Sequence, residues 1–282
     1  MPSLSDRTIR LPSGQDVPAL GQGTWFMGDR PDQTAEEIKA LRRGIDLGMT
    51  LIDTAEMYGN GAAEVLVGEA IRDCRADVFL VSKVLPNRAS QEGTIKACEG
   101  SLQRLGTDRI DLYLLHWRGQ VPLAETIEAF EQLVSAGMIR HWGVSNLDTS
   151  DMQELVGASG GNAVQTDQIL YNLSRRGIEF DLLPWCRSRN IPVMAYSPIE
   201  QGRLLAHPTL NMIAKAHNAT SAQIALAWLL RQEGVIAIPK AGRLSHVEEN
   251  RRALNVTLSD DDLAALDQAF HPPSSPTPLE ML

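Results

Sequence analysis

The chain has 282 residues, of which 43% are hydrophobic, and it contains 22 glycines and 15 prolines. This ordinary usage fits a globular protein with a sizeable core and excludes collagen-like, low-complexity and small disulfide-bonded classes. The formal net charge of −9 gives no general attraction to nucleic acid or anionic lipid, so neither is expected as a partner.

The cysteines and the N-terminal segment are typical of a protein from a reducing compartment. Cys74, Cys98 and Cys186 are odd in number and widely spaced, which favours a reducing environment over a disulfide framework. Residues 1–11 lack the apolar core of a signal peptide, and no apolar run reaches the roughly 18 residues of a membrane span. We therefore expect a soluble, cytoplasmic protein, and the acidic composition favours a monomer.

Short apolar or β-branched runs alternate with amphipathic segments along the whole chain. The candidate strands begin at Leu20, Thr50, Val78, Ile110, Ile139, Ala163, Pro192 and Val235. Helices are predicted between them at residues 35–47, 62–71, 92–105, 123–136, 152–156, 180–187 and 221–231. The predicted N-caps are Thr34, Ser90, Asp151 and Ser221, and the predicted helix ends lie at Gly48, Gly106 and Gly137.

Eight such units predict an α/β fold, a (β/α)8 TIM barrel that forms one domain over residues 1–282. A doubly wound open sheet is the alternative, although eight units exceed its usual size. An N-terminal β-hairpin within residues 7–19 is expected to plug one end of the barrel, and extra helices are expected at 245–254 and 259–270. The Pro/Ser-rich tail, residues 271–282, is expected to be loosely ordered.

Polar residues stand at the C-terminal ends of the candidate strands, where barrel enzymes carry their catalytic groups. They are Asp53, Lys83, His116, Ser145, Asn146, Gln168, Tyr196, Ser197 and Lys240, with Tyr58 in the loop after Asp53. Each alone is as often a cap, a surface charge or a structural group, but the whole set favours an active site. No metal is expected, because His116 has no second His or Cys at ligand spacing.

Five segments then support a family resemblance. They are residues 52–59 (IDTAEMYG), 81–83 (VSK), 114–117 (LLHW), 143–146 (GVSN) and 238–240 (IPK). Together, and in this order over about residues 8–270, they resemble the aldo-keto reductase superfamily, in a short-looped bacterial form. The resemblance implies reversible hydride transfer between a nicotinamide cofactor and an aldehyde or ketone.

The residue chemistry agrees with that reaction. Tyr58 is protonated at neutral pH and can act as the acid, since an unperturbed tyrosine has a pKa of about 10. Lys83 would stabilise the tyrosinate, and Asp53 would hold Lys83 charged. His116, as a neutral donor, would orient the carbonyl oxygen.

The cofactor site follows from the resemblance. Ser145, Asn146 and Gln168 are expected to bind the nicotinamide carboxamide, and Tyr196 is expected to stack on the ring. The loop beside the pyrophosphate comprises Ser197, Pro198, Ile199, Gln201 and Gly202. The other implied cofactor-binding residues are Gly23, Thr24, Trp25, Asp53, Ile238, Pro239, Lys240, Ala241, Arg243, His246, Glu249 and Asn250.

The adenosine end departs from the commonest family pattern. Lys240 matches the lysine that contacts a 2′-phosphate, which favours NADPH. His246 stands where many members have arginine, and Ala241 where serine is common, so phosphate binding is weakened unless Arg243 compensates. We expect NADPH to be preferred and NADH also to be used.

The expected substrate pocket is apolar and aromatic, with walls formed by Trp25, Met57, Tyr58, His116 and Trp117. It suits small aldehydes, methylglyoxal-like dicarbonyls and sugar or ring ketones. Short loops predict an open, permissive site, and Arg118 is either a cation near the mouth or a solvated surface charge.

Two other function classes are compatible with parts of this pattern, a regulatory subunit and a lyase. The superfamily includes cofactor-binding regulatory subunits of potassium channels, which contact partners and turn over little. A barrel lyase would use Lys83 in a Schiff base, but pairing with Asp53 makes that amine a poor nucleophile. A Rossmann fold is not expected either. The segment from Gly21 to Gly23 resembles the start of the dinucleotide-binding pattern G-x-G-x-x-G, but Phe26 stands in place of the third glycine.

Overall fold

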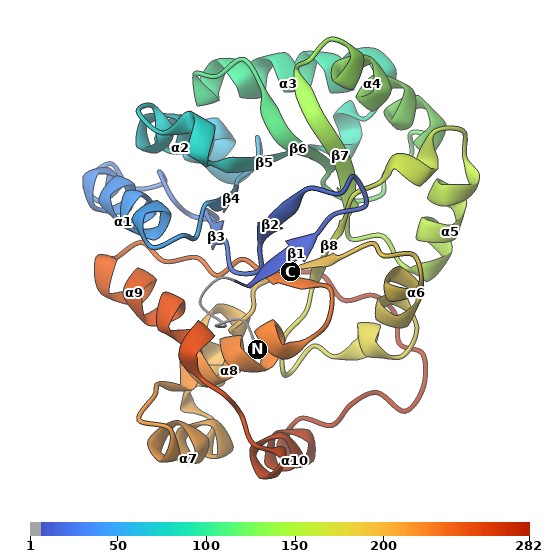
Figure 1. Cartoon of the computed structure of the whole chain (residues 1–282). Coiled ribbons are helices and arrows are strands. Elements are labelled where there is room, and N and C mark those ends of the chain that lie inside the picture. The colour runs from blue at the N-terminus through green and yellow to red at the C-terminus, as the bar shows by residue number, and fades with distance from the viewer. Residues whose placement is uncertain (1–6) are drawn as a thin grey trace.

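The computed structural model describes residues 7–282, so the first six residues of the expected leaderless N-terminus lie outside its description. A central sheet of eight parallel strands follows the order of the chain (Figure 1). The strands are β3 (Gln22–Gly23), β4 (Leu51–Asp53), β5 (Phe79–Val84), β6 (Ile110–Leu115), β7 (Ile139–Ser145), β8 (Asp167–Leu170), β9 (Val193–Tyr196) and β10 (Val235–Ala237).

The two edges of this sheet meet and close it into a barrel. Leu20 forms a parallel bridge with Ala237, and Gly23 forms another with Lys240. The Gly21 N–H donates to the Ala237 carbonyl at 2.8 Å. The predicted (β/α)8 barrel is therefore confirmed, and the alternative of an open doubly wound sheet is set aside.

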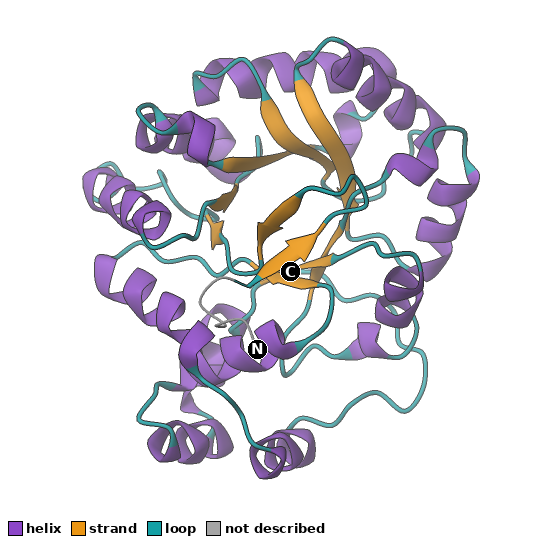
Figure 2. Ribbon diagram, in the orientation of Figure 1, coloured by secondary structure: helices purple, strands orange, loops and turns teal. Residues whose placement is uncertain are grey.

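Helices surround the sheet on its outer face (Figure 2). They bury apolar faces against the strands, and the main core lies between the two layers. The helices of the repeat are α1 (Thr34–Asp46), α2 (Ala62–Ile71), α3 (Gln91–Leu105), α4 (Leu123–Ser135), α5 (Thr149–Gly157), α6 (Leu182–Ser188) and α8 (Ser221–Arg231). The further helices are α7 (Pro208–Ala216), α9 (Leu244–Arg252) and α10 (Asp260–Ala269).

The predicted hairpin is present and closes one end of the barrel (Figure 1). β1 (Thr8–Arg10) pairs antiparallel with β2 (Asp16–Pro18). Ile9 is buried in the inner apolar cluster, and the Ser13 N–H donates to Gln165 Oε1 at 2.8 Å, just before β8 begins. Because the hairpin covers the N-terminal ends of the strands, a site can open only at their C-terminal ends.

Local signals placed most helices within a residue or two but misassigned several caps. Ser90 caps α3 as predicted, with its hydroxyl accepting from the Gly93 N–H. α5 begins earlier than expected because the Asp148 carboxylate accepts from the Asp151 N–H at 2.8 Å. The observed N-caps are Gln33 for α1, Asp148 for α5 and Thr220 for α8, in place of Thr34, Asp151 and Ser221.

Two elements differ more from the expectation. α7, which begins at Pro208, was not predicted, since it lies in a long segment between the seventh and eighth repeat strands. β8 begins at Asp167 rather than at Ala163, because Gly161–Ala163 forms a 3-10 turn.

Among residues 7–282, no helix is long and apolar enough to cross a membrane. All three cysteines are free thiols. Cys98 and Cys186 are buried, and burial raises the pKa of the Cys98 thiol to about 12. The buried thiols are therefore poor nucleophiles.

Asp167 is a fully buried carboxyl at the start of β8. Burial raises its pKa well above the ordinary range, and the backbone of Leu147 offsets this only in part. The folded protein therefore holds Asp167 protonated at pH values where the unfolded chain, with a pKa near 3.9, releases the proton.

We predict that Asp167→Asn flattens the dependence of stability on pH. In the wild type, unfolding releases a proton from this group, so its contribution to stability falls as pH rises above about 4 and levels off at the folded pKa. Urea unfolding between pH 4.5 and 7.5 should give a stability difference, variant minus wild type, that grows by up to about 1.4 kcal/mol per pH unit. Parallel curves for the two proteins would contradict this.

Candidate active site and cofactor cleft

Asp53, Lys83 and Tyr58 form one buried hydrogen-bonded cluster at the C-terminal ends of β4 and β5. Lys83 Nζ lies 2.9 Å from each carboxylate oxygen of Asp53 and donates to the Thr54 carbonyl at 2.9 Å. It is also 3.0 Å from the Tyr58 hydroxyl, which the 3-10 turn Tyr58–Gly61 carries just beyond β4. The strand-end residues predicted to act together are thus in contact.

The charges in this cluster support each other. Burial by itself lowers the pKa of Lys83, but Asp53 and the Tyr58 oxygen outweigh it, so the pKa is raised and the amine stays charged. Burial raises the pKa of Tyr58, and Lys83 counteracts part of that rise. Tyr58 is therefore a protonated donor at neutral pH, and charged Lys83 is unsuited to form a Schiff base.

His116 follows β6 and faces the same place. Its ring centroid lies 5.8 Å from that of Tyr58 in an edge-on arrangement. Burial and the Lys83 cation lower the pKa of His116 to about 2. Its Nδ1 has no hydrogen-bond partner within residues 7–282. The ring is therefore neutral at physiological pH, with a hydrogen on one of its two nitrogens.

Further hydrogen bonds join this cluster to residues at the C-terminal ends of β7, β8 and β9. Gln168 Nε2 donates to Asp53 Oδ1 at 2.7 Å, and Ser145 Oγ donates to the Gln168 carbonyl at 2.8 Å. Asn146 Nδ2 donates to Ser145 Oγ at 3.1 Å, while Asn146 Oδ1 accepts from the Tyr196 hydroxyl at 3.0 Å. Burial raises the pKa of Tyr196 to about 12, so it too is protonated.

A cavity of about 250 Å³ opens over these groups. Its residues include every predicted substrate contact, and Ser145, Asn146 and Gln168 lie here rather than in the larger cleft next to it. Met281 and Leu282 of the tail complete the wall, so the mouth is less open than the short loops suggested. The lining residues are Trp25, Met57, Tyr58, His116, Trp117, Ser145, Asn146, Gln168, Tyr196, Met281 and Leu282.

The Arg118 side chain is paired with acidic residues. Arg118 Nη1 lies 3.1 Å from Asp151 Oδ1 and 3.0 Å from Glu154 Oε2, both on α5. These carboxylates neutralise it, so Arg118 supplies no free positive charge to this cavity.

A second cavity of about 510 Å³ shares Trp25, Tyr58 and Tyr196 with the first, so the two adjoin. Most of the predicted cofactor residues line it, together with Phe26, Leu205 and Ala222, which carry no sequence signal. Pro239 and Ala241 do not line it, although Gly23 donates to the Pro239 carbonyl. Its lining residues are Gly23, Thr24, Trp25, Phe26, Asp53, Tyr58, Tyr196, Ser197, Pro198, Ile199, Gln201, Gly202, Leu205, Ala222, Ile238, Lys240, His246, Glu249 and Asn250.

The loop after β9 borders this cleft in a strained conformation. Ser197, Glu200 and Gln201 have φ values of 47°, 50° and 54°, and Gly202 has 88°. Side-chain-bearing residues rarely adopt this left-handed region, which costs about 1–3 kcal/mol each, and such strain concentrates at ligand sites. Asn172 holds the loop by donating to the Ser197 carbonyl at 2.9 Å.

The far end of the cleft is basic and acidic at once. Lys240, Arg243 and His246 line a further cavity of about 250 Å³, together with Gln33, Glu36, Glu37 and Gly242. Lys240 Nζ lies 3.9 Å from Glu37 Oε1. This end can bind a phosphate, and the nearby Glu37 carboxylate weakens that binding because it carries the same sign of charge as the phosphate.

Within the described residues, no group of three or more His, Cys, Asp or Glu side chains is placed to hold a metal ion.

Comparison with known proteins agrees with this geometry. The sequence model of the Aldo/keto reductase family matches residues 19–270. The chain belongs to the aldo/keto reductase family. As a member it is an oxidoreductase of the class that acts on carbonyl groups.

Individual relatives span nearly the whole chain. Methylglyoxal reductase YeaE of Escherichia coli (strain K12) is 52% identical, over 99% of this chain and 100% of its own. Glyoxal reductase of Bacillus subtilis (strain 168) is 34% identical, over 95% and 94%. A crystal structure of an aldo/keto reductase from Klebsiella pneumoniae, in complex with NADP and acetate, has a TM-score of 0.96 and 51% identity, over 98% of this chain and 100% of that one.

We predict that His116 stays neutral from pH 5 to pH 8, because burial and Lys83 lower its pKa to about 2. Nitrogen-15 NMR of the imidazole should show one unchanged neutral tautomer across this range. Lys83→Met removes one of the two causes and should raise the His116 pKa. A midpoint between pH 5 and 8 in the wild type would refute the prediction.

Proposed function

We propose that this reductase catalyses the NADPH-dependent reduction of small aldehydes and ketones to alcohols, with Tyr58 as the general acid. The observation that carries the proposal is the buried chain from Asp53 through Lys83 to Tyr58, which faces one cavity and adjoins a long cleft. Tyr58 has both a proton to give and a charged partner for the oxygen left behind.

The residues of the cluster take separate roles in this mechanism. The nicotinamide supplies a hydride to the carbonyl carbon when NADPH is bound. Tyr58 and neutral His116 donate hydrogen bonds to the carbonyl oxygen, on which negative charge develops, and Tyr58 transfers its proton to it. Lys83 stabilises the resulting tyrosinate, and Asp53 keeps Lys83 charged and in place.

The donor set of the cleft fits a nicotinamide dinucleotide. Tyr196 offers an aromatic face at the junction of the two cavities, and Asn146 and Gln168 offer amides beside it for the carboxamide. The strained loop 197–202 follows the cleft, which supports a role beside the pyrophosphate. Lys240 at the far end suits a 2′-phosphate, and the Klebsiella pneumoniae relatives bound to NADP or NADPH support the same cofactor.

The cavity size and walls support a small carbonyl substrate. About 250 Å³ bounded by Trp25, Trp117 and Met57 suits a carbonyl compound of a few carbons. The relative that is 52% identical is a methylglyoxal reductase, which makes methylglyoxal the first substrate to test. We further propose a monomer, consistent with the formal net charge of −9.

Tyr58→Phe removes the acid with little change in volume. We expect turnover of methylglyoxal to fall by about 100-fold or more, with the NADPH dissociation constant unchanged within about twofold. Steady-state absorbance of NADPH measures the first quantity, and fluorescence titration measures the second. Tyr113→Phe, which removes a buried hydroxyl outside both cavities, is the matched control and should keep full activity.

Two outcomes would count against this proposal. An equal loss of NADPH affinity in Tyr58→Phe would make Tyr58 structural rather than catalytic. Tight NADPH binding with no turnover of any aldehyde, dicarbonyl, sugar aldehyde or cyclic ketone would favour a regulatory, cofactor-binding protein.

Lys240→Met tests the cofactor preference. Loss of a charged hydrogen bond to the 2′-phosphate should lower kcat/KM for NADPH by about tenfold and leave kcat/KM for NADH nearly unchanged. Lys215→Met, on the exposed face of α7, is the control. Equal or higher kcat/KM with NADH in the wild type would overturn the preference itself.

A further inference from the structure

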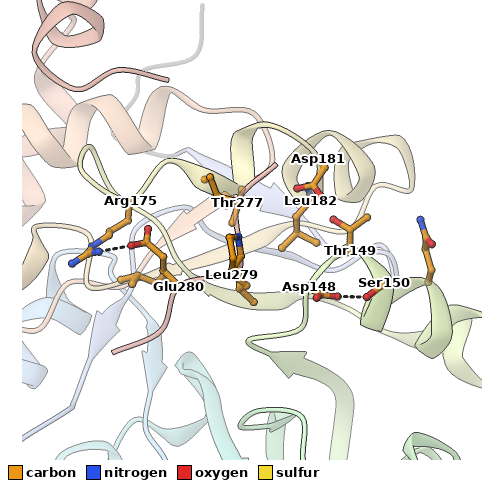
Figure 3. A pocket seen from close by; sticks show the side chains of 14 residues that line it. Asp148, Thr149, Ser150, Arg175, Asp181, Leu182, Thr277, Leu279 and Glu280 are labelled. Carbon is orange, nitrogen blue, oxygen red and sulfur yellow. Dashed lines mark hydrogen bonds and ion pairs between the residues drawn. The ribbon is translucent and has the colours of Figure 1, made fainter. Parts of the chain in front are cut away.

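The tail, residues 271–282, has no helix or strand, yet its end is tied to the body of the barrel. Arg175 Nη1 forms an ion pair with Glu280 Oε1 (Figure 3). Thr277 approaches Gly177 so closely that a Cβ at this glycine would overlap the Thr277 hydroxyl. The family match ends at Phe270, so this tail lies outside the matched part of the chain.

Cavities on both sides leave the tail without continuous packing. One of about 280 Å³ lies between the tail and the first turns of α5 and α6, where Thr149, Asp181 and Leu182 face Thr277 and Leu279 (Figure 3). A wider groove of about 690 Å³ runs along Phe270 to Glu280. Leu279 packs against the main core and Thr277 lies against Gly177, and the ion pair between Arg175 and Glu280 is the charged contact that holds the last residues of the tail.

The position of the tail end matters because it borders the substrate cavity. Met281 and Leu282 come directly after Glu280 and line the cavity beside Tyr196. Burial raises the pKa of Tyr196, and the backbone of Leu282 lies close enough to its hydroxyl to counteract part of that rise. Moving Glu280 therefore moves the wall that the substrate contacts.

The other side of Arg175 binds the cofactor loop. Its Nη2 and Nε lie 3.0 and 3.2 Å from Glu200 Oε1. Glu200 is buried, has a positive φ, and also accepts from Asn172 Nδ2 at 2.8 Å and Arg203 Nη2 at 2.9 Å. One guanidinium thus joins the strained loop beside the cleft to the tail beside the substrate cavity.

We propose that Arg175 is a positioning residue that couples cofactor binding to the substrate-cavity wall. Resting on the proposed function, the inference is that NADPH holds the loop around Glu200 in one conformation. That conformation presents Arg175 to Glu280 and fixes Met281 and Leu282. Substrate then meets a formed pocket only after the cofactor has bound, and the coupling is reciprocal.

Kinetics at saturating NADPH test the coupling. Arg175→Gln and Glu280→Ala should each raise KM for methylglyoxal by about tenfold, with kcat changed by less than about twofold. The double variant should show no further rise, because both changes break one link. Arg175→Lys keeps the charge and should recover part of the loss.

Arg203→Gln is the matched control, because Arg203 bonds Glu200 but not Glu280. It should weaken NADPH binding as Arg175→Gln does and leave KM for methylglyoxal unchanged. A rise in KM equal to that of Arg175→Gln would show that the loop alone matters and would overturn the role of the tail link.

A binding measurement separates this inference from the proposed function. Carbon-13 methyl NMR should show that NADPH raises the order parameter of the Met281 methyl in the wild type but not in Arg175→Gln or Glu280→Ala. The same response in all three would refute the coupling, even if methylglyoxal is reduced. An Arg175-dependent response without turnover of any carbonyl would uphold the coupling and refute the proposed reaction, and absence of NADPH binding would refute both.

Discussion

The structure of the site depends on a charged lysine buried without solvent. Lys83 is fully buried, and taking an ammonium out of water is very unfavourable unless a partner and hydrogen bonds compensate. Asp53 supplies the partner at 2.9 Å because β4 and β5 are paired with Asp53 opposite Val81. Lys83, two residues further along, points to the same side of the sheet. The register of the barrel strands thus sets the distance between Lys83 and Asp53.

The same constraint explains the surrounding polar residues. Asp53 needs a further donor in the buried interior, and Gln168 from the far side of the barrel provides it. A buried ion pair is weak grounds for stability, since apolar residues of similar volume often serve as well. Its presence here is better explained by Tyr58, whose hydroxyl it holds at the cavity wall. Strained residues such as Gln201 also gather around the cleft, as expected of ligand sites.

Much of this arrangement follows from local patterns in the chain. Apolar runs at regular spacing predict the strands, and the strand-end rule selects Asp53, Lys83 and His116. Caps and element starts are less predictable, because Asp148 and Asp151 are both good N-caps and only packing chooses between them. α7 has no predicted counterpart, because it lies within the long connection between β9 and β10 rather than in the repeating unit.

The sequence by itself predicted the barrel and the strand-end cluster of Asp53, Lys83 and Tyr58 from residue type at fixed positions in a repeating unit, and the family resemblance predicted most residues that line the long cleft. Only the tertiary structure decided that Arg118 is neutralised by α5, that Glu280 of the tail pairs with Arg175, and that Met281 and Leu282 line the cavity over Tyr58. These contacts join residues far apart in the chain. No local periodicity encodes them, because they depend on where the closed barrel brings separate loops together.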